Sequence, residues 1–297
     1  HDCHIVVRCV CSSNYRLQET GMTKERILRL FLHLYVCAVF VFVFLPIITS
    51  FVFSFNSDRF PSLPLGHFTT HWYQTIFNDS DIWEAFGVSA IVSASVALLS
   101  TFIGFCTAYT DYRFNFRGKS IYLALALLPP TIPLVIMGLA MLALLSRINM
   151  SGEIYSIIVS HVVLCSPFAM AVIRMRLAQI DPDLESAAWN LGASEWRAMH
   201  QVILPFCAPA IVSAFCLTAA VSFDEFAVSW FVSGLNKTVP VIILEILQGN
   251  TDPQINAIGS IVFITSMTLV VLAQIIYMTK ASDQRALTGV ITRRQDQ

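Results

Sequence analysis

The sequence predicts an all-α integral membrane protein with six transmembrane helices, and three observations carry that prediction. Its 297 residues are 56% hydrophobic. Only 12% of them are charged, about half the fraction of a typical soluble domain. The apolar residues gather in runs of about 20, the length at which an α-helix crosses the hydrocarbon core of a bilayer.

Six apolar runs are long enough to be membrane spans. They cover residues 30–53, 84–109, 121–145, 154–173, 206–231 and 255–279. Pro46 is expected to kink the first of them, because proline lacks the backbone N–H of a regular helix. The polar loop that follows carries Trp72, Tyr73 and Trp83, whose amphipathic rings favour a membrane interface.

The six runs define one membrane domain over residues 24–280. Residues 1–23 are polar and irregular, without apolar periodicity, and are expected to form an atypical N-terminal tail. Residues 281–297 are also polar and form a C-terminal tail. After the fifth span, the apolar residues 241–247 are too few to cross a bilayer and predict a helix that dips into it.

Basic residues set the expected orientation of the spans. The N-terminal tail, the turn at residues 111–119, the segment between the fourth and fifth spans, and the C-terminal tail fall on one side. That side holds all of the Lys and Arg residues except Arg59, Arg147 and Lys237. Because cytoplasmic loops carry the excess of Lys and Arg, both termini of this multi-pass chain are expected in the cytoplasm.

Charge and cysteine content argue against several other classes of protein. The net charge of −1 gives no sign of nucleic-acid binding. The apolar spans are instead expected to contact membrane lipid. The eight cysteines lie in apolar runs or in the N-terminal tail and show no disulfide framework. Cys9 and Cys11 lack the second pair of ligands that a zinc site needs, so no metal is expected.

The polar stretch between the fourth and fifth spans begins with signals for a short helix outside the bilayer. Asp181 is a good N-cap, and Pro182 is a good first helical residue. Asp183 and Glu185 place negative charge in the first turn, where the helix dipole favours it.

A second short helix is expected directly after the first. Gly192 supplies a residue that turns left-handed at a helix end, and Ser194 can cap a helix that runs to Pro205. Taken alone, these features fit any capped helix pair between two membrane spans.

The same stretch resembles the cytoplasmic coupling loop of ABC-importer permeases. The pattern is carried by Glu185, Ala187, Ala188, Gly192 and residues 203–205 (Ile-Leu-Pro), with Glu-Ser-Ala-Ala in place of Glu-Ala-Ala. The resemblance implies a type I ABC-importer permease fold with cytoplasmic coupling helices, the first of which lies in a groove of an ATPase subunit. We call residues 181–204 the coupling loop. Its residues expected at the ATPase are Asp183, Glu185, Ala188, Leu191, Gly192 and Ala193.

Three prolines mark the third span. Pro129, Pro130 and Pro133 cannot sit in an unbroken helix, because each lacks an N–H and clashes with the carbonyl four residues back. Broken backbone at membrane depth is tolerated against protein or a water-filled cavity, so this segment is expected on the pore side. A direct role in gating and a merely kinked, packed helix both remain open.

Two adjacent carboxylates, Asp224 and Glu225, lie inside the fifth span. A charge at that depth costs about 2.5 to 3.5 kcal/mol on insertion scales, so something must compensate it. Neighbouring positions on a helix differ by about 100°, so both side chains face one space only if the helix is locally opened. Phe223, Phe226 and Trp230 add aromatic faces, and carboxylates with aromatic walls suit a small organic cation.

A narrower resemblance points to the solute. Residues 222–226 read Ser-Phe-Asp-Glu-Phe, residues 238–240 read Thr-Val-Pro, and residues 161–168 hold His-x-x-x-Cys-x-Pro-Phe. Over residues 24–280 the chain looks like the second permease subunit of the spermidine/putrescine importers, in which the carboxylate pair is Asp-Asp. The resemblance implies that this pair and its aromatic neighbours line the path of a polyamine. Permeases for iron, opines, amino acids and other solutes share much of the pattern and are the alternatives.

Other roles for these residues stay open. Asp224 and Glu225 can instead pair with polar or basic groups of a partner subunit and stabilise only the assembly. His161 in apolar company is more often a hydrogen-bonded packing residue than a ligand. Glu245 is either a further cation contact or, as its place outside the spans favours, an exposed surface residue.

The chain is expected to be a transport subunit and no enzyme. It lacks the Gly-x-x-x-x-Gly-Lys-Ser/Thr phosphate cradle of such ATPases, so no cofactor is expected on it. The resemblance implies a bacterial inner-membrane complex with a second homologous permease subunit, two cytoplasmic ATPase subunits that carry ATP and Mg, and a periplasmic substrate-binding protein.

Two rivals come from other classes. One is a self-sufficient secondary transporter or channel that uses the carboxylate pair as a proton or ion relay. The other rival is a membrane-embedded enzyme. The sequence supports it less, because no cluster of metal ligands and no nucleophile–base spacing recurs on one face of the spans.

Overall fold

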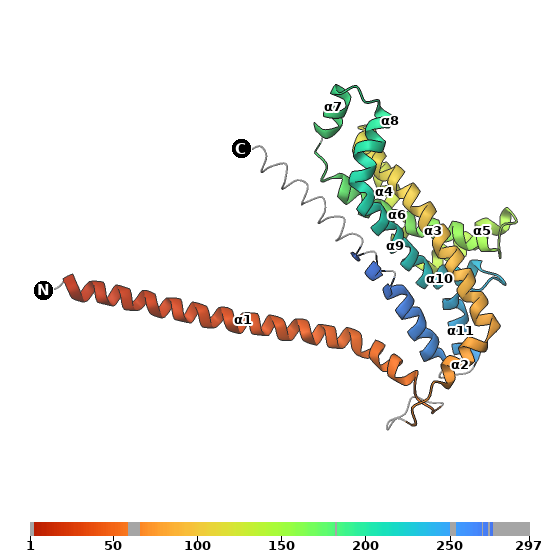
Figure 1. Cartoon of the computed structure of the whole chain (residues 1–297), viewed down its shortest axis with the longest axis horizontal. Helices are drawn as coiled ribbons and strands as arrows, with labels where there is room; N and C mark the ends of the chain where they lie inside the picture. Colours follow the sequence, from red (N-terminus) through yellow and green to blue (C-terminus); the bar gives the residue numbers. More distant parts are fainter. Residues whose placement is uncertain are drawn as a thin grey trace.

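The computed structural model describes residues 3–58, 66–181, 183–249, 254–268, 270–272 and 274–275. Most of this backbone is helical (Figure 1). The helices are α1 (Cys3–Phe53), α2 (His71–Asn78), α3 (Ser80–Arg113), α4 (Lys119–Leu127), α5 (Leu134–Arg147), α6 (Ile154–Leu177), α7 (Asp183–Asn190), α8 (Glu195–Ala198), α9 (Leu204–Asp224), α10 (Ala227–Val232) and α11 (Val239–Gly249). A 3-10 turn occupies Pro129–Thr131, a π-helical turn occupies Met199–Ile203, and a last helix begins at residue 254.

Within the described residues, five helical stretches are long and apolar enough to cross a membrane. They are Arg26–Phe53, Ser80–Arg113, Ile154–Leu177, Glu195–Asp224 and Gln254–Leu272. These stretches correspond to the first, second, fourth, fifth and sixth predicted spans. The prediction of an all-α membrane protein is therefore confirmed.

The third predicted span consists of two shorter helices, α4 and α5, with the 3-10 turn between them. The chain is extended at Ile132 (ψ 132°) and at Pro133 (ψ 126°). The break that the three prolines predict is thus present at the expected place.

The centre of the fold is a bundle of α3, α6 and α9, which lie side by side (Figure 1). One apolar cluster, which includes Val96, Ile157 and Val228, joins α3 and α6 to α5 and α10. A second cluster, which includes Ile173 and Cys207, holds the end of α6 against the start of α9. The two clusters lie one after the other along the bundle and make α6 its common element.

Gly104 allows α3 and α6 to pack closely. A Cβ at this position would lie 2.7 Å from the backbone N of Met170 and 2.7 Å from the Cβ of Ala169, both on α6. A larger residue would force the two helices apart. The absence of a side chain here therefore sets the spacing of the central bundle.

Helix α1 runs away from the bundle (Figure 1). The apolar window of its candidate span is 0% buried, so its side chains need lipid or another chain as cover. Its backbone is helical from Cys3, so residues 3–23 of the N-terminal tail continue the helix of the first span. Extending a helix costs far less than nucleating one, and α1 continues from the apolar span into the polar residues. The C-terminal tail, residues 281–297, lies outside the described residues.

Helix also extends further into the polar segments than the apolar runs indicate. Helix α2 occupies part of the polar loop after the first span, and α3 begins at Ser80. The cause at α3 is a cap: Asp79 Oδ1 accepts the backbone N–H of Asp81 (3.0 Å) and of Ile82 (3.4 Å).

The sequence predicts a helix end at Pro205, but the chain there stays helical. Helix α8, the π-helical turn and α9 form one uninterrupted run through this proline. Proline lacks an N–H and crowds the carbonyl four residues back. The π-helical turn lies directly before Pro205. Its wider backbone leaves room for the proline ring, so the helix continues although one hydrogen bond is missing.

Candidate functional site

The fifth span opens at the carboxylate pair. Helix α9 ends at Asp224, Glu225 adopts an extended conformation (φ −72°, ψ 120°), and α10 begins at Ala227. The local opening that two adjacent carboxylates require to share a space is therefore present. Their side chains nevertheless lie in different surroundings.

The carboxylate of Glu225 caps α10 from inside the bundle. Only 4% of its side chain is exposed. It accepts the backbone N–H of Val228, 3.0 Å from each carboxylate oxygen, and the backbone N–H of Ser229 at 3.1 Å. Its Oε2 also lies 3.2 Å from His161 Nε2. The N–H groups and the dipole of α10 stabilise a negative charge at this position.

His161 connects Glu225 to three helices. Its ring is fully buried on α6. Nδ1 lies 2.9 Å from Ser222 Oγ on α9, and Nε2 lies 2.9 Å from Ser229 Oγ on α10. The prediction of a hydrogen-bonded packing residue is confirmed. Buried polar groups are costly unless they are paired, so this network favours one arrangement of α6, α9 and α10.

Asp224 is exposed in the isolated chain, in contrast to its neighbour. Its Oδ1 accepts a hydrogen bond of 3.0 Å from the hydroxyl of Ser266, in the last helix. Asp224 is the final residue of α9, so any change in the direction of that helix moves its carboxylate. Of the two acids, only Asp224 is open to an external cation.

The predicted aromatic residues divide between the two environments. Phe223 is buried and packs against Phe86, with ring centroids 6.4 Å apart. Phe226 is half-buried and Trp230 is exposed, and their ring centroids lie 6.0 Å apart. Phe226 and Trp230 are therefore the aromatic faces that remain open beside the helix break.

The proline break lies on the outside of the bundle. Leu128, Thr131 and Pro133 are exposed, whereas Ile132 packs against the apolar cluster between α3 and α6. Pro129 and Pro130, like Ile132, are half-buried. Exposed, broken backbone at membrane depth requires water or another protein beside it. Its place on the pore side stays a prediction.

The coupling loop has the predicted helix–turn–helix form. Asp181 Oδ1 accepts the backbone N–H of Asp183 at 3.0 Å, at the start of α7. Gly192 is left-handed, with φ of 82°. Ser194 Oγ accepts the backbone N–H of Arg197 at 3.3 Å and caps α8. The predicted helix-starting residue at position 182 lies outside the described residues.

The residues expected at an ATPase differ in exposure. Asp183, Leu191 and Gly192 are exposed, and Ala188 and Ala193 are half-buried. Glu185 instead is buried, with 8% of its side chain exposed. At the turn, the apolar residue Leu191 is 89% exposed.

Arg113 holds the buried face of the coupling loop. This last residue of α3 places its Nε 4.0 Å from Glu185 Oε2 on α7 and its NH2 group 3.7 Å from Glu195 Oε1 on α8. Its guanidinium carbon also lies 4.6 Å from the centre of the Trp189 ring. The sequence marks Arg113 only as a basic residue at the end of a span, so this role was missed.

A second ion-pair cluster lies at the same end of the bundle. Asp111 on α3 is buried and accepts a hydrogen bond of 2.6 Å from Arg174 Nε at the end of α6. Lys119 Nζ at the start of α4 lies 3.2 Å from the other carboxylate oxygen of Asp111. These contacts join α3, α4 and α6 beside the coupling loop. Among the described residues, no group of three or more His, Cys, Asp or Glu side chains is placed to hold a metal ion.

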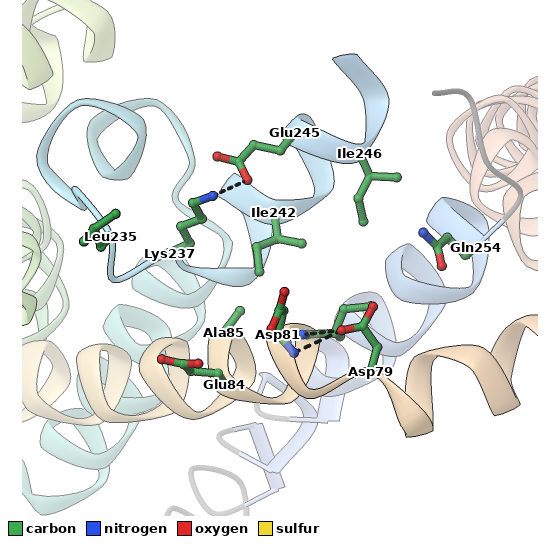
Figure 2. A pocket seen from close by; sticks show the side chains of 11 residues that line it. Asp79, Asp81, Glu84, Ala85, Leu235, Lys237, Ile242, Glu245, Ile246 and Gln254 are labelled. Carbon is green, nitrogen blue, oxygen red and sulfur yellow. Dashed lines mark hydrogen bonds and ion pairs between the residues drawn. The ribbon is translucent and has the colours of Figure 1, made fainter. Parts of the chain in front are cut away.

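The opposite end of the bundle has an acidic outer cavity of about 390 Å³ (Figure 2). Asp79, Asp81 and Glu84 line it from the start of α3, across from Lys237 and Glu245. Lys237 Nζ lies 2.7 Å from Glu245 Oε2, so that pair is neutral overall. Glu245, predicted as either a cation contact or a surface residue, is half-exposed and paired within the chain.

Comparisons with known proteins agree with this architecture. Residues 100–287 match the family model described as "Binding-protein-dependent transport system inner membrane component". The spermidine/putrescine transport system permease protein PotC of Haemophilus influenzae is 34% identical over 239 residues, which are 80% of this chain and 93% of that protein. The putrescine transport system permease protein PotI of Escherichia coli is 29% identical, over 75% of this chain and 82% of that protein.

Solved structures share the fold at low sequence identity. A chain of the bacterial alginate ABC transporter, in complex with alginate pentasaccharide-bound periplasmic protein, superposes with a TM-score of 0.63 at 16% identity. The match covers 91% of this chain and 97% of that one. An amino acid ABC transporter chain gives a TM-score of 0.56 at 16% identity, over 70% of this chain and 98% of that one. The chain therefore belongs to the binding-protein-dependent transport system inner membrane components, the multi-pass permease subunits of ABC importers, which are transport subunits and no enzymes.

Proposed function

We propose that this chain is one permease of a heteromeric ATP-driven importer and forms half of the translocation path for a polyamine such as spermidine or putrescine. The observation that carries the proposal is Asp224, an exposed carboxylate at a helix break inside the fifth span. Among the described residues its hydrogen-bond partner is the neutral hydroxyl of Ser266. A charge at membrane depth needs compensation, and a passing ammonium group supplies it.

The aromatic residues beside the break support an organic cation over a bare ion. Phe226 and Trp230 keep part of their surfaces open. Aromatic faces attract alkylammonium groups through their quadrupoles, which adds roughly 0.5 to 2 kcal/mol for each contact. A chain of methylenes and ammonium groups can use the carboxylate and the aromatic faces in turn.

The choice of a polyamine among organic cations draws on the relatives. The names of PotC and PotI specify spermidine/putrescine and putrescine transport. The main departure from the Asp-Asp pattern is Glu225, whose extra methylene belongs to the cap of α10 and to the contact with His161. This substitution therefore affects the geometry of the break more than the charge offered to a cation.

Coupling to ATP is assigned to the exposed face of the coupling loop. In this proposal α7 and the turn at Leu191 lie in a groove of a cytoplasmic ATPase subunit, with Asp183, Ala188, Gly192 and Ala193 at or beside the contact. Two such subunits carry ATP and Mg. A second homologous permease completes the path, and a periplasmic binding protein docks over the acidic outer cavity.

The proposal implies an orientation in a bacterial inner membrane. Both termini and the coupling loop face the cytoplasm, as the distribution of Lys and Arg favours. The acidic outer cavity then faces the periplasm, because the start of α3 and α11, which line it, lie at the other end of the bundle from α7 and α8 (Figure 1).

Uptake by the reconstituted complex tests the proposal. The chain is co-expressed with its partner permease, ATPase and binding protein, and the complex is placed in proteoliposomes with ATP inside. Labelled spermidine, putrescine, an opine and an amino acid are supplied with the binding protein. ATP-dependent uptake of a polyamine alone supports the proposal. Uptake of another solute in place of a polyamine contradicts the assignment of a polyamine as the solute. Uptake without the ATPase contradicts the assignment to ATP-driven importers.

A further inference from the structure

We infer that His161 is a positioning residue for solute passage: it fastens α10 to α6, so that the break after Asp224 acts as a hinge between α9 and a rigid α6–α10 unit. The inference rests on the proposed role of Asp224 as the cation contact. It concerns a side chain that touches no solute and acts through Glu225.

The first step of the argument is that α10 is attached to α6 at both of its ends. At its start, His161 Nε2 lies 2.9 Å from Ser229 Oγ and 3.2 Å from the capping carboxylate of Glu225. At its end, Ser156 Oγ of α6 donates a hydrogen bond of 2.7 Å to the carbonyl of Val232. A helix of six residues held at both ends has little freedom to move relative to α6.

Close packing against α5 adds a third attachment. A Cβ on Gly138 of α5 would lie 2.6 Å from the ring of Phe231 and 3.3 Å from the carbonyl oxygen of Ala227. Val228 and Val232 are fully buried in the same apolar cluster. Close-packed interiors shift as units and resist gradual deformation.

The connection of α10 to α9 is weaker by comparison. The extended backbone at Glu225 interrupts the helix between them. Within the network around His161, the direct contact with α9 is the hydroxyl of Ser222, 2.9 Å from Nδ1. His161 thus touches both sides of the break, through two groups on the α10 side and one on the α9 side.

The coupling loop is connected through the chain to the helices on both sides of the break. Helix α6 runs directly into the coupling loop, and the loop continues through α8 and the π-helical turn into α9. If the coupling loop moves so that α6 shifts relative to α9, the backbone therefore changes direction at the break after Asp224. Asp224 moves with α9, while Glu225 stays with α6 and α10.

The test compares His161→Phe, which keeps a ring but removes both nitrogens, with His161→Gln, which keeps one donor and one acceptor. Ser160→Ala is the matched control, because that buried hydroxyl donates only to Ser156 O within its own helix. Uptake is measured per assembled complex. We expect His161→Phe to lower the maximal rate about tenfold, as the loss of a buried hydrogen-bonded partner permits, with KM within about twofold because the binding protein captures the solute. His161→Gln should recover part of the rate, and Ser160→Ala should match the wild type.

A milder variant covers the case in which His161→Phe does not assemble. Ser222→Ala removes the contact on the α9 side alone, and Ser213→Ala is its control, since that hydroxyl bonds only to Pro209 O in α9. We expect Ser222→Ala to lower the maximal rate per complex and Ser213→Ala to leave it unchanged. A wild-type rate per complex in His161→Phe and Ser222→Ala, or an equal loss in their controls, would overturn the inference.

A distance measurement separates this inference from the proposed solute. Spin labels at Leu217 on α9 and at Leu235 just beyond α10, which are 36% and 93% exposed, report the angle at the break in the nucleotide-free and ATP-trapped complex. We expect two distinct distances in otherwise unsubstituted protein and one broad distribution in His161→Phe. If the complex shows these distances but takes up no polyamine, the proposed solute is wrong and the proposed hinge still stands. An identical, narrow distance in both nucleotide states contradicts the hinge.

Discussion

Asp224 and Glu225 are adjacent in the chain but face opposite surroundings. Asp224 is exposed beside Ser266, whereas Glu225 is enclosed against His161 and the first N–H groups of α10. The two acids are therefore expected to respond differently to loss of charge. One should affect transport and the other should first affect the fold.

The first prediction is that Asp224→Asn lowers polyamine uptake per complex by about tenfold or more and leaves thermal stability unchanged. The exposed carboxylate loses its charge while its size and its bond from Ser266 are retained. Glu225→Gln should lower the midpoint of thermal unfolding, because removing a buried charged acceptor costs about 1 to 3 kcal/mol.

Asp224→Glu is the control for charge and should keep most of the uptake. Uptake and unfolding are measured on complexes purified by size exclusion. A lowered unfolding midpoint in Asp224→Asn, with no change in Glu225→Gln, would reverse the two assignments. Undiminished uptake in Asp224→Asn would remove this carboxylate from the path.

The sequence could predict the coupling loop because its signals are local. The cap at Asp181, the left-handed Gly192 and the cap at Ser194 each act within a few residues, and all three are present. The proline break of the third span is local for the same reason. Each depends on the conformational limits of single residues.

The division between the two acids could not be read from the sequence. It depends on His161, which a separate helix brings to within 3.2 Å of Glu225. The burial of Glu185 is a similar case, because its partner Arg113 lies at the end of α3. Apolar runs predict that a helix crosses the membrane but not which of its polar residues meets which neighbour.

The second prediction concerns Gly192, whose φ of 82° is strained for residues with a side chain. A Cβ here meets nothing within 4 Å, so the cost of substitution lies in the backbone alone, about 1 to 2 kcal/mol for an ordinary L-residue. Gly192→Val should weaken binding of the ATPase, and Gly192→Asn should be milder, since Asn tolerates this conformation. Pull-down of the ATPase measures both. Equal binding by the two variants would contradict a conformational role.

The third prediction is that deleting residues 1–23 leaves transport intact. Their backbone continues α1 from Cys3, but they precede the span Arg26–Phe53 and lack its apolar character. Membrane fractionation measures whether the shortened chain inserts, and labelled solute measures its uptake. A shortened chain that inserts and assembles normally yet carries nothing would assign the tail a role in transport.

The fourth prediction is that Gly104→Ala destabilises the chain by about 1 to 3 kcal/mol, as overpacking typically does. The added methyl group would lie 2.7 Å from the backbone N of Met170, which cannot yield as a flexible side chain does. Gly87→Ala, also on α3, is the control, because a Cβ there meets nothing within 4 Å. Thermal unfolding in detergent should separate the two variants, and equal midpoints would show that the spacing of α3 and α6 adjusts freely.

The last prediction is that Arg113 links the coupling loop to α3. Its guanidinium contacts Glu185, Trp189 and Glu195, which come from both short helices. Glu185→Lys would place two positive charges together in a buried site, so we expect α7 to be displaced, binding of the ATPase to weaken and uptake to fall. Arg113→Met should loosen the same attachment without repulsion and have a smaller effect.

Exchanging the two charges separates this pairing from a direct contact between Glu185 and the ATPase. In Arg113→Glu with Glu185→Arg, the attraction between α3 and α7 is restored, and uptake should exceed that of Glu185→Lys alone. Arg117→Gln is the control, since that exposed arginine lies in the turn just beyond α3. If Glu185 instead contacts the ATPase directly, the exchange restores nothing, because the partner subunit still meets a positive charge. Recovery by the exchanged pair therefore assigns Glu185 to the attachment of α7. Its absence in a triple variant that also carries Glu195→Gln, which removes the repulsion that the exchange creates at Glu195, assigns Glu185 to the ATPase.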